Sequence, residues 1–184
     1  MQVTLELNEY SIDFRRILAE ETKEPAILNK LVEDNDWRVR EAVAKNANTT
    51  SEALATLAED KKFSVCRAVV RHANTTSEAL ATLAEDKHWR VRLDVAKHID
   101  TTSKTLDKLA EDEDCIVRKA VARHVNTTSE TIAKLAEDEE WSVRKAVAEN
   151  INTTPKILIK LAEDKDEDVR DAAKQALMKR SETK

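Results

Sequence analysis

The apolar residues of this chain form two short helical patterns that alternate along the sequence. In residues 48–73, Leu54, Leu57 and Ala58 are spaced i, i+3 and i+4, and the same spacing returns at Val65 and Ala68. Apolar residues with this spacing share one face of an α-helix. The segment therefore predicts two amphipathic helices, a first helix around Leu54 and a second helix over 63–73.

This helix pair recurs every 26 residues. The stretch NTTSEALATLAED at 48–60 returns almost letter for letter at 74–86. A fixed period in this range is typical of repeats that stack on their neighbours into a solenoid. We expect six repeats, which cover 22–47, 48–73, 74–99, 100–125, 126–151 and 152–177.

The two ends depart from the repeat. Residues 1–21 are expected to cap the N-terminal end, with Val3, Leu5 and Leu7 alternating like a short strand and Tyr10, Phe14, Ile17 and Leu18 on one face of a helix. The same strand could instead pair with the sheet edge of another chain. Residues 178–184 are expected to form a polar tail that is disordered from Lys179.

Composition supports an all-α chain. It has no Gly and only Pro25 and Pro155, and both prolines fall in the first turn of a first helix, where a missing N–H costs little. Each first helix is expected to begin at the first Thr of the NTT motif: Thr49, Thr75, Thr101, Thr127 and Thr153. A Glu three residues later completes a capping box in three repeats, at Glu52, Glu78 and Glu130.

The repeat resembles the leucine-rich repeat variant motif in its order of LAED, VR, AVA and N-x-NTT, over residues 22–177. It departs from that family at Ala47 and Thr50, where the family has Pro. It also resembles HEAT and armadillo repeats in an Asp followed six residues later by an Arg, as at Asp34 and Arg40. The resemblance implies a right-handed α-solenoid. The iron–sulfur cluster of the family's founding type is not expected, because no Cys precedes Cys66, and we expect no cofactor.

Most recurrent polar residues have a structural interpretation. The Asp and Arg ladder is expected to bond neighbouring repeats, with Cys66 as a small filler in one Arg position. His72, His98 and His124 share one repeat position about 10 Å apart, too far for one zinc ion, and are expected to bond turn groups. Trp37, Phe63, Trp89 and Trp141 are expected to pack across the turn between the helices, although an aromatic row can bind a partner. His88 is expected to be exposed.

The row most informative about function is the face of each second helix opposite its apolar stripe, here called the ridge. Its middle is basic and holds Leu93 and Ile116 as two apolar residues, as a central anchor within a charged rim would. The ridge consists of Arg38, Glu41, Lys45, Ser64, Arg67, Arg71, Arg90, Leu93, Lys97, Ile116, Lys119, Arg123, Ser142, Lys145, Glu149, Asp168, Asp171 and Gln175. The plain alternative is a solvated face with two scattered apolar residues.

The ridge favours a scaffold that binds an acidic protein or peptide through Leu93, Ile116, Arg67, Arg71, Arg90, Lys97, Lys119 and Arg123. A nucleic-acid-binding solenoid is the alternative, although the net charge of −5 gives it no support. A self-assembling rod is a third possibility, opposed by the polar last helix.

Enzymatic activity is not expected, since a chain without Gly has no Gly-rich phosphate loop and no catalytic constellation breaks the repeat. No apolar run is long enough to cross a bilayer. We expect a monomer of the reducing cytoplasm.

Overall fold

The computed structural model describes residues 7–182. The expected strand residues Val3 and Leu5 lie outside this range. The chain divides into two compact units, Met1–Asp94 and Val95–Lys184, and each is described by itself.

Apart from a short 3₁₀-helix, Leu7–Glu9, the regular structure of the described residues is α-helical. The first unit holds α1 (Ile12–Glu21), α2 (Pro25–Leu31), α3 (Trp37–Lys45), α4 (Ser51–Leu57), α5 (Phe63–Val70), α6 (Ser77–Leu83) and most of α7 (Trp89–Lys97). The second unit holds α8 (Ser103–Leu109), α9 (Cys115–Arg123), α10 (Ser129–Leu135), α11 (Trp141–Glu149), α12 (Pro155–Leu161) and α13 (Glu167–Glu182). The all-α prediction is confirmed.

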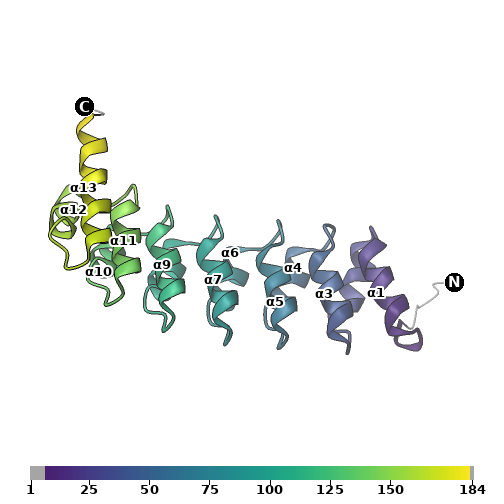
Figure 1. Cartoon of the computed structure of the whole chain (residues 1–184). Coiled ribbons are helices and arrows are strands. Elements are labelled where there is room, and N and C mark those ends of the chain that lie inside the picture. The colour runs from purple at the N-terminus through teal and green to yellow at the C-terminus, as the bar shows by residue number, and fades with distance from the viewer. Residues whose placement is uncertain (1–6, 183–184) are drawn as a thin grey trace. The chain divides into compact units, whose positions relative to one another are not determined.

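Second helices pack against second helices within each unit. In Figure 1, α1, α3 and α5 lie side by side in the first unit, as do α9, α11 and α13 in the second. The core between the helices is built from two fully buried side chains of each first helix, for example Leu54 and Leu57 or Ile132 and Leu135. Each such side chain contributes roughly 1.5–3 kcal/mol when buried. The burial of these side chains in every first helix confirms the predicted apolar stripes and the helix pair as the repeating unit.

The first helices begin one residue later than predicted. Thr50, not Thr49, is the N-cap of α4, and its side chain accepts a hydrogen bond from the backbone N–H of Ala53. The hydroxyl of Thr49 donates instead to the carbonyl of Val43, 2.5 Å away, at the end of the preceding second helix. Thr50 thus caps the start of α4, and Thr49 bonds the end of α3. The predicted capping box at Glu52 is therefore wrong, because Glu52 is the second residue of α4 and not the third.

The N-terminal helix α1 buries a different face from the one predicted. Arg15 and Ala19 are its buried residues, whereas Tyr10, Phe14 and Ile17 are 45%, 45% and 50% exposed. The rings of Tyr10 and Phe14 stack on each other at the surface, with their centroids 4.7 Å apart.

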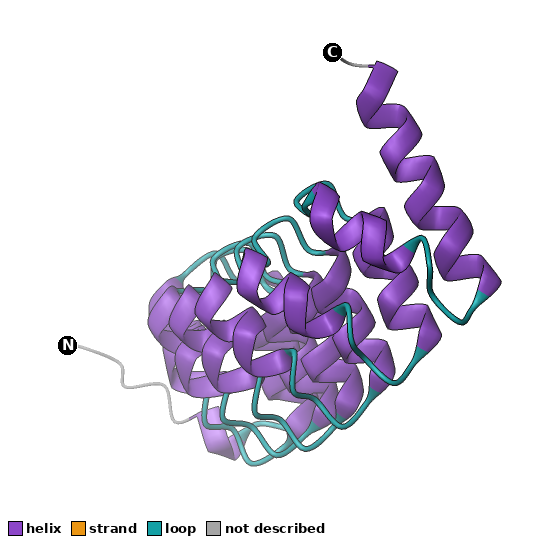
Figure 2. Ribbon diagram, turned by 90° about the vertical axis from the view of Figure 1, so that its left-hand side faces the viewer, coloured by secondary structure: helices purple, strands orange, loops and turns teal. Residues whose placement is uncertain are grey.

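The C-terminal helix α13 is longer than the repeat requires. It continues to Glu182, so the segment predicted as a disordered tail from Lys179 is helical as far as the structure describes it. Figure 2 shows the helix that ends at the C-terminus extending past its shorter neighbours in the second unit.

Candidate functional site

The Asp and Arg ladder joins neighbouring repeats, as expected. Arg144 donates from Nε to Asp164 Oδ2 at 2.7 Å and from Nη2 to Asp164 Oδ1 at 2.8 Å, which is a bidentate ion pair. Its Nη1 also donates to the carbonyls of Asp138 and Glu139. The hydrogen bond from Arg144 lowers the pKa of Asp164, and the bond to Asp164 raises the pKa of Arg144. The side chains of Arg144 and Asp164 are 6% and 9% exposed. This ion pair therefore has a structural role and is not accessible to a partner.

The ladder extends one helix further toward the N-terminus than the sequence pattern suggested. Arg15 of α1 donates from Nε to Asp34 Oδ2 at 2.6 Å and from Nη2 to Asp34 Oδ1 at 3.2 Å. Helix α1 therefore takes the place of a second helix. A signal was present in the sequence, because Arg15 precedes Asp34 by 19 residues and Arg40 precedes its partner Asp60 by 20.

Cys66 stands in the ladder position that Arg holds in the other repeats. Its thiol donates to the carbonyl of Asp60, 3.0 Å away. Arg144 donates to the carbonyl at the same repeat position, that of Asp138. Burial, together with the nearby carboxylate of Asp86, raises the pKa of Cys66 to about 12. The filler interpretation is therefore supported, because a thiol with this pKa is a poor nucleophile at neutral pH.

The Asn and His positions at the ends of the second helices also have a structural role. His72 donates from Nε2 to the carbonyl of Asn46 at 2.9 Å and accepts at Nδ1 from the N–H of Asn74 at 3.0 Å. A neutral ring with its proton on Nε2 satisfies both bonds. Asn46 makes the equivalent pair, from Nδ2 to Ala19 O at 2.8 Å and at Oδ1 from the N–H of Asn48. The prediction that these side chains bond turn groups is confirmed at these positions.

His88 is not exposed as predicted but half-buried, and its ring stacks on Phe63 with the centroids 4.1 Å apart. Phe63 thus packs against the turn of the following repeat. The guanidinium of Arg67 also lies over this ring, 5.2 Å from its centroid.

Many ridge cations form ion pairs, either with carboxylates of other ridge residues or with carboxylates beside the ridge. Arg67 Nε lies 2.7 Å from Asp94 Oδ2 and Arg71 Nη2 lies 3.4 Å from the same oxygen. Further pairs are Arg38 with Asp36 at 2.8 Å, Lys45 with Glu41 at 2.6 Å, Arg123 with Glu149 at 3.0 Å and Lys145 with Asp168 at 2.9 Å. The ridge is less basic than its list of cations suggests.

Sequence reasoning missed Asp94. It occupies a repeat position that holds Ala42, Ala68, Ala120 and Ala146 elsewhere, and a carboxylate at a position otherwise kept for alanine is a visible break in the pattern. Because Asp94 meets both Arg67 and Arg71, it sets the charge of the ridge in the first unit.

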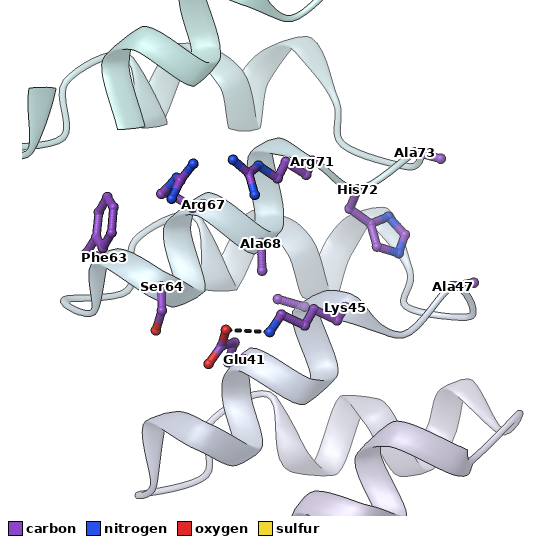
Figure 3. Close-up of a pocket in the computed structure, with 11 residues that line it drawn as sticks. Glu41, Lys45, Ala47, Phe63, Ser64, Arg67, Ala68, Arg71, His72 and Ala73 are labelled. Atoms are coloured by element: carbon purple, nitrogen blue, oxygen red, sulfur yellow. Dashed lines mark ion pairs between the residues drawn. The ribbon is translucent and has the colours of Figure 1, made fainter. Parts of the chain in front are cut away.

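A groove runs along the ridge between α3 and α5. Its volume is about 450 Å³, and the alanines Ala44 and Ala68 line it where longer side chains would fill it. Figure 3 shows Arg67 and Arg71 on one side of Ala68 and the ion pair of Glu41 and Lys45 on the other. Small apolar residues between charged ones suit an extended segment that carries both kinds of side chain.

The two predicted anchors differ in accessibility. Leu93 is half-buried in the first unit, and Ile116 is 46% exposed in the second. A single anchor made of both stays a prediction. Of the other predicted site residues, Arg90 and Lys97 are exposed, with the Arg90 guanidinium 5.2 Å from the Trp89 ring centroid, and Lys119 is half-buried.

No group of three or more His, Cys, Asp or Glu side chains in residues 7–182 is placed to hold a metal ion. Likewise, none of the helices described is both long and apolar enough to cross a membrane.

Among solved structures, the chain is similar to a leucine-rich repeat variant described as having a novel repetitive protein structural motif. The similarity has a TM-score of 0.74 at 26% sequence identity and covers 94% of this chain and 69% of that one. The family resemblance drawn from the LAED and NTT motifs is thereby confirmed, and so is the repeat fold.

More distant similarities lie with an engineered protein, at a TM-score of 0.42, 21% identity and coverage of 95% and 92%, and with computationally designed armadillo repeat proteins for modular peptide recognition, at 0.38, 19%, 96% and 94%. Neither is close enough to support a conclusion about this chain. No family model matches the sequence, and no curated protein does.

Proposed function

The chain has the fold of the leucine-rich repeat variant, and from that premise we propose that it is a non-catalytic scaffold that binds an acidic protein or peptide along the ridge. The repeat scaffold is the established part. The proposed binding of an acidic partner is supported by the groove between α3 and α5, which combines small apolar residues with Lys45, Arg67 and Arg71.

Charge and exposure suggest how an acidic side chain would bind there. The Arg71 side chain is 61% exposed and reaches Asp94 only at 3.4 Å, whereas that of Arg67 is 29% exposed and bonded at 2.7 Å. An incoming carboxylate competes with Asp94 most easily at Arg71. A charged pair across an interface adds selectivity and speed of association more than raw affinity.

A nucleic-acid partner is the second candidate, and the ion pairs of the ridge count against it. Binding to a polyanion depends on several free cations that displace counterions. Asp94 and Glu149 already pair with Arg67, Arg71 and Arg123.

The test is capture of partners from a lysate of the source organism on the immobilised full chain, with and without nuclease. The variants are Arg67→Glu with Arg71→Glu, and separately Ile116→Glu. Lys23→Glu with Lys30→Glu is the matched control, because it makes the same charge change at exposed positions outside the ridge.

The proposal expects a nuclease-resistant protein that the ridge variants lose and the control retains. A catch that disappears with nuclease and falls steeply with salt would establish the nucleic-acid alternative. Equal capture by the wild type and the ridge variants would rule out the ridge as the binding surface.

A further inference from the structure

A row of exposed apolar side chains lies on the turns of the second unit, just after the ends of the second helices. Ile99, Val125 and Ile151 occupy one repeat position, immediately after the His or Asn that ends each second helix, and they are 66%, 53% and 80% exposed. They are here called the turn row. The same position in the first unit holds Ala47 and Ala73. Three successive β-branched side chains at an exposed turn position are unusual for a surface without a partner.

The backbone of the turn row is fixed by the following repeat. Asn126 Nδ2 donates to Ile99 O at 3.2 Å, and Asn152 Nδ2 donates to Val125 O at 2.7 Å. Arg180 of α13 donates from Nη2 to Ile151 O at 2.8 Å. The side chains are therefore presented by an ordered backbone, which lowers the entropy lost when a partner binds.

The spacing of the row suits a helix. Stacked helices lie about 8–10 Å apart, so successive members of the row are separated by about one such layer. Seven residues of an α-helix rise about 10.5 Å. A helix with apolar residues at i, i+7 and i+14 therefore places one side chain against each member of the row.

Charge at the two ends of the row points to an acidic helix. Lys97, which also belongs to the ridge, and Lys104 lie on either side of Ile99 in the sequence, both exposed and without an ion pair among the described residues, and the carboxylate of Asp100 lies between them. At the other end, Lys156 is likewise exposed and unpaired, and Arg180 lies on the carbonyl of Ile151.

The middle of the row is not basic, because Arg123 and Glu149 pair with each other and Glu130, at the repeat position of Lys104 and Lys156, is an exposed carboxylate. A second copy of this chain fits less well, since a stable protein interface buries roughly 800 Å² on each partner and three side chains fall well short of that.

We propose that the turn row is a docking surface for an acidic amphipathic helix of another protein, whose apolar residues repeat every seven positions. The apolar residues of this surface are not ridge residues, and the proposal does not depend on the function proposed for the ridge, although Lys97 belongs to both surfaces.

The experiment uses the full chain with labelled Ile and Val methyl groups and follows their NMR signals during titration with synthetic helical peptides of about 21 residues, long enough to span the row at 1.5 Å per residue. The test peptide carries Leu at its first, eighth and fifteenth positions and Glu beside the first and last Leu. One control has the same composition with the leucines out of register, and a second replaces the flanking Glu with Lys.

We expect the test peptide to shift the methyl signals of Ile99, Val125 and Ile151, and each control peptide to bind at least about tenfold more weakly. The variant Ile99→Ser with Val125→Ser and Ile151→Ser should lose binding. Ile159→Ser, at a 59% exposed position on α12, should retain it.

Unchanged methyl signals at millimolar test peptide would overturn the proposal, as would equal binding of the out-of-register peptide. Sedimentation of the wild type supplies a further check. A dimer that the triple variant abolishes would assign the row to self-association and equally overturn it.

Discussion

In residues 95–182 the ladder residues Arg118 and Arg144 donate to the Asp of the next repeat, Asp138 and Asp164, whereas in residues 7–94 the series is interrupted at Cys66. The apolar turn row shows the opposite contrast, with small residues in the first unit and β-branched residues in the second. The ladder position thus departs from Arg once, at Cys66, whereas the turn position is Ala in the first unit and β-branched at all three places in the second. The differences mark where the chain is free to specialise.

The largest effect should come from breaking an intact rung. Arg144→Ala leaves the buried carboxylate of Asp164 without its partner, and we expect a loss of about 3–5 kcal/mol in the free energy of unfolding. Urea denaturation followed by circular dichroism measures it. Arg40→Ala in the first unit should cost less, because the Arg40 side chain is 17% exposed and that of Arg144 is 6% exposed. Equal losses would mean that burial does not distinguish the two rungs.

A smaller effect of opposite sign on the free energy of unfolding is expected when an Arg is restored at the ladder position of Cys66. Cys66→Arg places a guanidinium between the carbonyl of Asp60 and the carboxylate of Asp86, and should raise the free energy of unfolding by about 1 kcal/mol. Cys66→Ala is the control and should lower it slightly, because the thiol bond to Asp60 is lost. A destabilised Cys66→Arg variant would show that the first unit has adapted its packing to the smaller side chain.

The smallest effect is expected at the helix ends. His72→Asn should change the free energy of unfolding by less than about 0.5 kcal/mol, because Asn46 in the preceding repeat donates to the corresponding carbonyl of Glu20 and accepts from the N–H of Asn48. His72→Ala, which removes both bonds, should cost about 1–3 kcal/mol. The two variants are compared by thermal melting at the same pH. A costly His72→Asn variant would show that the imidazole ring packs in a way the amide cannot replace.

The fold could be predicted from the sequence because the 26-residue period, the apolar stripes and the ladder all specify one helix pair. The helix start was misplaced by one residue because NTT offers two equivalent threonines, and only the carbonyl of Val43 distinguishes them. The α1 face was misassigned because its apolar residues suggested a core face, whereas Arg15 and the ladder orient the helix.

The candidate site was predicted less completely. The positions of the ridge follow from helical periodicity, but its charge depends on which side chains of adjacent repeats meet. Asp94 pairs with Arg67 and Arg71 across a repeat boundary, and these contacts join residues 27 and 23 positions apart. His88 was assigned to solvent for the same reason, since its partner Phe63 belongs to the previous repeat.

Arg180 determines how this array could be lengthened. Its guanidinium takes the turn carbonyls of Ile151 and Thr153 that an asparagine of a following repeat would otherwise reach. A repeat appended after α13 would therefore meet acceptors already in use. A repeat inserted between Ile151 and Asn152 would supply its own turn carbonyls as acceptors. The last helix pair, α12 and α13, would then follow it without change. For protein engineering, the permitted insertion point is internal, and the C-terminal helix can be kept as a fixed end piece for arrays of different length.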